Sequence, residues 1–393
     1  VRLGKLFARN TIRNIACIPD SLSIHMQSVT KPIVVVGAGP SLDRCIAFIK
    51  QHRDYVYILA IAAAARPLKD AGISPDAIVT VESQFATEKA FIGMNNSFVP
   101  LYADISSRPK MLSVTGAKPA FFLSEYYKSP LLERIKGFFP TIPIFPPLGS
   151  VSLSATELAL ALRSHSGKTP PVFVCGLDFA FSPGKTHCKE SPHAKEYLNT
   201  CNRLFPPGNP EAAFRYGSFK ISGKNDLCLF SDNSLKGYGM IFCERYAKTS
   251  ELYDISPEGM PLDIPYCDTT TASHIIEKYY KENTHLEKHN IDDCINSFEN
   301  AHRFYAEEKN KLLAIRDILT KKNIFEDDIA LQRIITLLEE CNYVYMHFAD
   351  AHKGVQIQRH FFNRVRAEID VFLKDIEIAE KILAKSKQRP LLR

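Results

Sequence analysis

The chain of 393 residues contains no tryptophan and no run of 18 consecutive apolar residues. A transmembrane helix needs about 20 mainly apolar residues, so we predict no membrane span. No basic-then-apolar leader opens the sequence, which leads us to expect a cytoplasmic protein. The apolar content of 45% is nevertheless high enough for buried cores in two domains.

The ten cysteines form no Cys-x-x-Cys pair, and their spacing is not that of zinc ligands. We therefore predict buried free thiols and no metal site. The net charge of +6 is spread along the chain. Nucleic-acid binding usually requires a denser basic stripe, so no nucleic-acid partner is expected.

The most informative segment is a short apolar run followed by two glycines. Ile33–Val36 has the composition of a strand buried on both faces, and Gly37 and Gly39 follow at once. Ser41 then precedes a helix-like pattern. Glycines let a phosphate approach the backbone, and the first N–H groups of a helix are unpaired, so these three residues are predicted to bind a nucleotide phosphate. A dinucleotide site would need a third glycine where Leu42 stands, and an ordinary strand-to-helix turn is the alternative.

Strand-like and helix-like segments alternate along the first two thirds of the chain. Strands are expected over residues 55–61, 77–82, 97–103, 172–175 and 252–256, and helices over 62–71, 151–163 and 234–248. This alternation predicts an α/β, Rossmann-like fold with a mainly parallel sheet and helices on both faces. Ligands of such sheets bind at the carboxyl ends of the strands, where Gly37, Glu82 and Asp178 fall.

Two further positions near these strand ends are candidates for nucleotide binding. Gly149 and Ser150 precede a predicted helix, whose first turn can hold a phosphate or ribose, although the pair is equally a plain helix cap. Asp178 ends an apolar strand, where a carboxylate costs free energy unless it is paired or solvated in a cleft. It can bind sugar hydroxyls, or it can stabilise the loop that follows.

Residues 180–231 are rich in Pro, Gly, Ser and Asn and are predicted to form a long loop or lid. His187 lies on this loop, where it can protonate a departing phosphate or act as the base, or it can simply be solvated. At the end of the loop, residues 231–234 form a helix-capping sequence, of which Asp232 or Asn233 is expected to face the same cleft.

The character of the chain changes beyond residue 270. Apolar residues recur with helical spacing in three stretches, with charged residues between them. We therefore divide the chain into a helical lead-in (1–30), an α/β catalytic domain (31–270) and an all-α C-terminal domain (271–393). We expect this last domain to dock a protein partner.

The order and spacing of these motifs resemble the motility-associated factor (Maf) family of flagellin glycosyltransferases, whose central domain is also described as pterin-pyrophosphokinase-like (MptE-like). The resemblance extends from about Leu6 to Asp263 and includes Gly37–Leu42, Gly176–Asp178 and the segment Gly184-Lys-Thr-His187. The same domain is distantly similar to bacterial sialyltransferases that use CMP-activated sialic acid.

The resemblance implies transfer of a nonulosonic acid, such as pseudaminic or legionaminic acid, from its CMP conjugate to Ser or Thr of flagellin. It implies flagellin as partner, with its chaperone as a further candidate, and no cofactor beyond the CMP-sugar donor. The sialyltransferases' catalytic histidine falls near Phe230 here, and one of their phosphate-holding tyrosines falls close to His187. The catalytic base is therefore either His187 or Asp232.

Two other functions remain open at the level of sequence. One is a pyrophosphokinase that moves diphosphate from ATP to a pterin alcohol. That chemistry usually needs Mg²⁺ and clustered carboxylates, whereas the acids at the strand ends are only Glu82 and Asp178. The other is a non-catalytic adaptor that binds flagellin through the helical domain.

Overall fold

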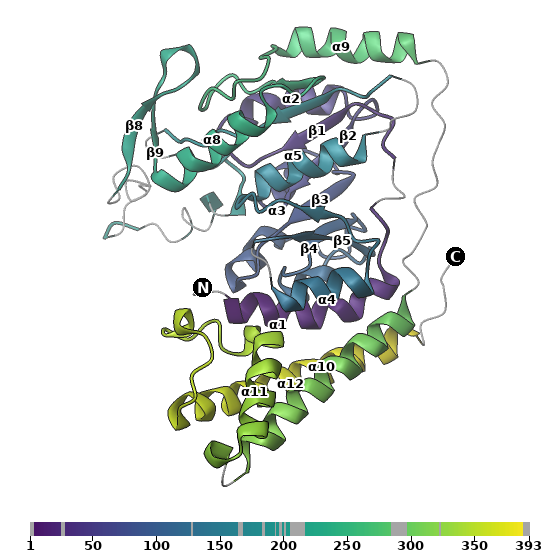
Figure 1. Ribbon diagram of the computed structural model, residues 1–393. Coiled ribbons are helices and arrows are strands. Elements are labelled where there is room, and N and C mark those ends of the chain that lie inside the picture. The colour runs from purple at the N-terminus through teal and green to yellow at the C-terminus, as the bar shows by residue number, and fades with distance from the viewer. Residues whose placement is uncertain are drawn as a thin grey trace.

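The fold is built on one large sheet in which every strand pairing is parallel (Figure 1). The computed structural model describes residues 4–24, 28–126, 129–163, 168–182, 185–192, 194–195, 199, 202–204, 217–283, 297–321 and 324–387. The sheet has eight strands in the order β10-β7-β1-β2-β3-β4-β5-β6. Helices lie in front of and behind it, so the predicted Rossmann-like α/β fold is confirmed.

The strands are short and their central members are fully buried. They are β1 (Ile33–Val36), β2 (Tyr57–Ile61), β3 (Ala77–Thr80), β4 (Leu101–Asp104), β5 (Pro119–Ser124), β6 (Ile144–Phe145), β7 (Val172–Cys175) and β10 (Leu252–Asp254). Val36 at the end of β1 is in register with Ala60 of β2 and Cys175 of β7. The three strand ends are therefore level, and the loops that leave them meet at one edge of the sheet.

The helices of the α/β part mostly follow the predicted segments. They are α2 (Leu42–Gln51), α3 (Ala62–Asp70), α4 (Pro130–Phe138), α5 (Val151–Leu162), α8 (Asn233–Tyr246) and α9 (Thr269–Glu282). The sequence pattern did not indicate α4, β5 or β6. Helix α9 crosses the predicted domain boundary after residue 270, and its Ala272 and Ile276 belong to the same hydrophobic core as β1 and β7.

A two-stranded hairpin, β8 (Phe219–Ser222) and β9 (Cys228–Ser231), projects from one side of the α/β part (Figure 1). It falls within the segment that was predicted to be a loop without long elements, of which residues 205–216 lie outside the described residues. Phe181 and Phe230 exchange two backbone hydrogen bonds of 2.8 Å, and the Ser231 hydroxyl donates to the Phe179 carbonyl at 3.0 Å. The hairpin is therefore joined to the segment that follows β7.

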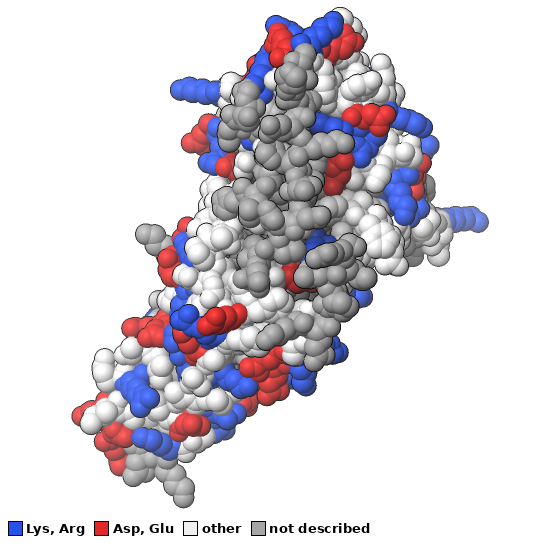
Figure 2. Space-filling model, turned by 90° about the vertical axis from the view of Figure 1, so that its right-hand side faces the viewer, with Lys and Arg blue, Asp and Glu red and all other residues white. Residues whose placement is uncertain are grey.

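The C-terminal part contains the long helices α10 (Phe298–Leu319), α11 (Asp328–Glu340) and α12 (Arg359–Lys387). Helix α1 (Gly4–Asn14) lies between this bundle and the β4–β5 side of the sheet (Figure 1). One hydrophobic core joins all three layers, since it includes residues of α1, the bundle and β5. Figure 2 shows basic and acidic side chains interspersed over the bundle on the face that it draws.

Candidate functional site

A cleft of about 530 Å³ opens at the carboxyl ends of β1 and β7. Its walls are the turns after these two strands, the first turns of α5 and α8, and the segment around residue 187. The predicted site residues that line it are Gly39, Ser150, Asp178, His187 and Asp232. The predicted site residues that do not line it are Gly37, Ser41, Glu82, Gly149 and Asn233.

The turn after β1 interlocks with the turn after β7. The N–H of Gly37 donates to the Cys175 carbonyl at 2.7 Å, and the N–H of Gly39 donates to the Gly176 carbonyl at 2.9 Å. A side chain on Gly37 would overlap the Gly176 carbonyl, and a Cβ on Gly39 would lie 2.5 Å from Oδ2 of Asp178. Glycine is therefore required at these two positions because two turns of the protein itself lie in close contact there.

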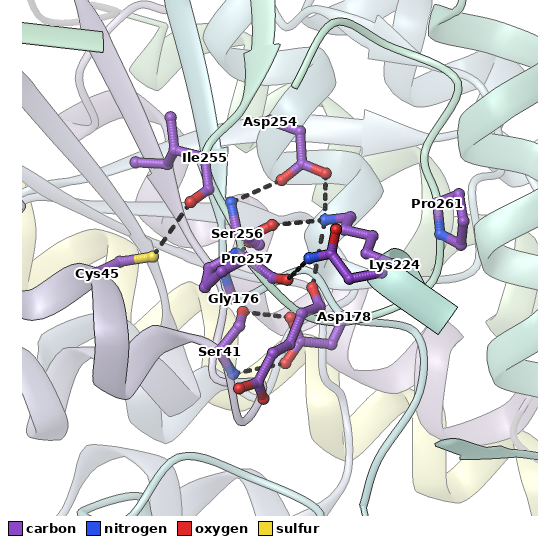
Figure 3. A network of polar contacts seen from close by, with 12 residues as sticks. Ser41, Cys45, Gly176, Asp178, Lys224, Asp254, Ile255, Ser256, Pro257 and Pro261 are labelled. Atoms are coloured by element: carbon purple, nitrogen blue, oxygen red, sulfur yellow. Dashed lines mark hydrogen bonds and ion pairs between the residues drawn. The ribbon is translucent and has the colours of Figure 1, made fainter. Parts of the chain in front are cut away.

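The carboxylate of Asp178 occupies the start of helix α2. It accepts the backbone N–H of Ser41 at 2.8 Å and a hydrogen bond from the Ser41 hydroxyl (Figure 3). Burial raises the pKa of Asp178 to about 6, although both Ser41 hydrogen bonds act in the opposite direction. Ser41 is fully buried, so a phosphate bound there would have to displace an internal carboxylate. The anion at this helix start is therefore the carboxylate of Asp178, a residue of the chain itself.

A buried ion pair that the sequence did not reveal lies beside Asp178. Nζ of Lys224, between β8 and β9, pairs with the Asp254 carboxylate at the end of β10 (Figure 3). It also donates to the carbonyls of Ser256 at 2.9 Å and Glu258 at 3.2 Å. Burial raises the pKa of Asp254, while Lys224 acts to lower it. Asp254 is the last residue of β10, whereas Asp178, which was predicted to end a strand, lies in the turn three residues after β7. The argument that a carboxylate at a buried strand end needs a partner could have identified Asp254 from the sequence.

The segment after β10 connects this ion pair to the β7 turn. The Ser256 hydroxyl accepts the Gly176 N–H at 3.1 Å, and the Met260 N–H donates to the Asp178 carbonyl at 2.8 Å. Gly259 has a φ of +102°, and a Cβ there would lie 2.8 Å from Cα of Asp178. The ends of β1, β7 and β10 and the hairpin are thus held in one polar network.

Helix α5 provides a second N-terminus, and this one faces the cleft. Ser150, Val151 and Ser152 all line it, and Oγ of Ser150 caps the helix by accepting the Ser152 N–H at 3.3 Å. Gly149 has a φ of +71°, and a Cβ there would lie 2.9 Å from the Tyr238 ring. Because the dipole and the N–H groups of a helix start attract anions, this wall can receive a phosphate.

His187 and Asp232, the two candidate catalytic residues, line the cleft from different parts of the chain. His187 is half-buried, with Nδ1 3.2 Å from the Thr186 hydroxyl, and the next residue donates its backbone N–H to the Ala38 carbonyl at 2.9 Å. Asp232 caps α8, and its Oδ1 accepts the Leu235 N–H at 2.9 Å. His187 is therefore held over the β1 turn, whereas the Asp232 carboxylate already has a structural partner. Gly184, part of the same sequence motif, lies outside the described residues.

Glu82 and Asn233 do not line the cleft. Glu82 is exposed in the loop after β3, where its carboxylate accepts the Gln84 N–H at 3.0 Å. Asn233 is exposed at the first position of α8. Within the described ranges, no group of three or more His, Cys, Asp or Glu side chains could hold a metal ion. No helix in the same ranges is long and apolar enough to cross a membrane.

Comparison with known proteins gives a family and a fold. Residues 9–184 match the family described as 6-hydroxymethylpterin diphosphokinase MptE-like. An uncharacterized protein of Treponema pallidum (strain Nichols) is 30% identical over 396 residues, covering 95% of this chain and 67% of the relative. A second uncharacterized protein of that strain is 32% identical over 99 residues, 23% of this chain and 46% of the relative.

Among solved structures, the chain is similar to a Maf glycosyltransferase from Magnetospirillum magneticum AMB-1, with a TM-score of 0.50 and 14% sequence identity. The match covers 99% of this chain, which spans 62% of the length of that glycosyltransferase. At this identity the likeness shows a shared fold.

Proposed function

The chain belongs to the MptE-like family and has a Maf glycosyltransferase-like fold, and we propose that it is itself a glycosyltransferase that acts in the cytoplasm. The observation that carries the proposal is the cleft, where an anion-attracting helix start, a histidine and two carboxylates converge. These are the groups needed to hold an activated sugar and to assist departure of its phosphate.

The proposed donor is a CMP-activated nonulosonic acid. Its phosphate would lie at the start of α5, against Ser150 and Ser152, with the sugar directed toward His187. The bond between the anomeric carbon and the phosphate oxygen breaks, and CMP leaves with the bonding electrons. An acceptor hydroxyl attacks the resulting oxocarbenium-like carbon and loses its proton to a base, His187 or Asp232.

The proposed acceptor is a Ser or Thr hydroxyl of a protein, with flagellin as the candidate that the family resemblance implies. The pyrophosphokinase alternative needs carboxylates that are available for Mg²⁺. In the cleft, Asp178 is engaged by Ser41 and Asp232 caps α8. This arrangement favours sugar transfer over transfer of a diphosphate.

A thermal-shift panel of CMP, CTP, ATP and a pterin, each with and without Mg²⁺, tests the proposal. We expect CMP to stabilise the protein without metal, because its monophosphate needs only the α5 start. Ser152→Asp places a carboxylate in the cleft and should abolish the CMP response. Ser250→Asp, at the exposed residue that precedes β10 at the opposite edge of the sheet, is the matched control and should keep it. Stabilisation only by ATP with Mg²⁺ would instead indicate the kinase, and no response to any nucleotide the adaptor.

A further inference from the structure

A second groove, of about 710 Å³, lies between strand β8 and helix α8. Residues 220–222 of β8 form one wall, and Lys236, Met240 and Glu244 of α8 contribute the other. Met260 also lines the groove. Met240 is 57% exposed, so its side chain is accessible to a bound ligand. Methionine is flexible and polarizable, so this groove can adapt to different side chains.

The pairing of the hairpin shows which way the backbone of β8 points. Lys220 is opposite Phe230 in the hairpin. The N–H and C=O of Phe230 are both hydrogen-bonded to Phe181, which lies on the other side of β9 from β8. Opposite residues of antiparallel strands alternate between hydrogen-bonded and non-hydrogen-bonded pairs. The N–H and C=O of Lys220 therefore point away from β9, and by the same alternation so do those of Ser222. In the part of the chain that the structure describes, no other strand pairs with this edge.

Helix α8 connects this groove to the cleft at the carboxyl ends of β1 and β7, where the sugar donor is proposed to bind. Asp232, Ser234 and Leu235 line the cleft, and the groove begins at Lys236. Since the helix rises about 1.5 Å per residue, the two openings lie within one turn of each other along the axis of α8, on different faces of the helix. A polypeptide extended along β8 advances about 3.3 Å per residue. A few residues that continue past the groove and around the start of α8 would bring a side-chain hydroxyl to the mouth of the cleft.

From these observations we propose that the outer edge of β8 binds an extended segment of the protein acceptor as an added strand, an inference that rests on the proposed function. In this mode, main-chain hydrogen bonds supply affinity and shallow pockets accept alternate side chains. The walls carry both signs of charge, from Lys220 and Lys236 and from Glu244 and Asp263. Such walls suit recognition of a backbone rather than of one charge pattern.

The test uses the full chain, CMP and a library of short serine- and threonine-containing peptides. Lys220→Pro removes an outward N–H without removing a hairpin hydrogen bond, and proline is tolerated at such edge positions. We expect peptide binding to weaken about tenfold or more, while CMP binding and hydrolysis of the sugar donor are retained. Lys220→Ala keeps the N–H and should weaken binding less, which separates the backbone from the charge.

A second pair of variants tests the wall formed by α8. Met240→Glu should weaken peptide binding, whereas Ile241→Glu, at an exposed neighbour outside the groove, should not. If Lys220→Pro perturbs the hairpin, this pair carries the test alone. Equal effects of Met240→Glu and Ile241→Glu on peptide binding would contradict the proposal that this groove binds the acceptor. CMP binding without binding of any peptide would contradict it as well. Absence of CMP binding and donor hydrolysis in the wild type would overturn the proposed function instead.

Discussion

The carboxylate of Asp178 accepts the backbone N–H of Ser41 at 2.8 Å, so the positive start of helix α2 is neutralised by the protein's own anion. The two residues are 137 positions apart in sequence and join the turns after β1 and β7. The Asp178 carboxylate makes this internal contact, and the residue also lines the cleft at the carboxyl ends of β1 and β7. Its ionisation therefore couples the stability of the fold to the site.

The raised pKa of Asp178 predicts a specific pH dependence of stability. An unfolded aspartate titrates near pH 4, whereas burial raises the pKa of folded Asp178 to about 6. Between these values the folded state binds more protons, so this residue's contribution to the free energy of unfolding falls as pH rises from about 4 to about 6. Asp178→Asn removes that contribution. Urea denaturation of both proteins across this range should show wild type losing stability relative to the variant, and parallel curves would contradict the prediction.

The buried pair of Lys224 and Asp254 predicts a large loss of stability when one partner is removed. The Lys224 side chain is 12% exposed and that of Asp254 is 2% exposed. Lys224→Met leaves a buried carboxylate unpaired, which typically costs about 3–5 kcal/mol. Lys195→Met, at the more exposed pair with Asp70, should cost about 1 kcal/mol or less.

Chemical denaturation measures both changes. Combining Lys224→Met with Asp254→Leu removes both charges and should recover part of the lost stability. Full recovery is not expected, because the carbonyls of Ser256 and Glu258 also lose their donor. A Lys224→Met protein as stable as the wild type would show that this pair does not anchor the hairpin.

The sequence predicted the positions of polar groups at the strand ends better than it predicted their partners. The β1 strand, its glycines and Asp178 were recognisable because local composition determines them. That Ser41 binds Asp178 depends on which strands become neighbours, and neither local pattern contains that information. Lys224 was missed for the same reason, since its partner Asp254 belongs to a strand beyond α8.

The hairpin and α9 show a second limit of the sequence argument. Strands β8 and β9 are four residues each, and β8 alternates between half-buried and exposed positions, so their apolar pattern is weak. Helix α9 has the amphipathic pattern of the helices that follow it. Periodicity shows that such a helix buries one face, but it does not show which core receives Ala272 and Ile276.

The roles of His187 and Asp232 can be separated by two substitutions. His187→Ala should slow sugar transfer about 100- to 10,000-fold if this residue carries the proton transfer. Asp232→Ser removes the carboxylate but keeps a good helix cap, since serine is a preferred N-cap residue. We expect the smaller loss for Asp232→Ser, because its carboxylate is engaged by the Leu235 N–H. Single-turnover transfer rates measure both effects, and the reverse order would identify Asp232 as the base.

The C-terminal bundle is bound to the α/β part through helix α1. Asp375 of α12 is buried and pairs with Arg9 and Arg13 on one face of α1. On another face, Asn10 donates to the carbonyls of Ser83 and Ser106, in the loops after β3 and β4. Helix α1 therefore connects the bundle to the carboxyl edge of the sheet.

This connection predicts that the bundle cannot be removed without damage to the fold. Truncation after Asp268 would expose the core shared by α1, α12 and β5 and should yield a protein that neither unfolds cooperatively nor binds CMP. Asp375→Ala is the milder test, because it leaves Arg9 and Arg13 without their shared carboxylate. Removing one partner of a buried pair costs about 3–5 kcal/mol, and these half-exposed arginines should place the loss near the lower end. Asp370→Ala, on the same helix but 65% exposed, should change stability little. Equal unfolding midpoints for the two variants, or a truncated protein that still binds CMP, would show that the bundle is an independent appendage.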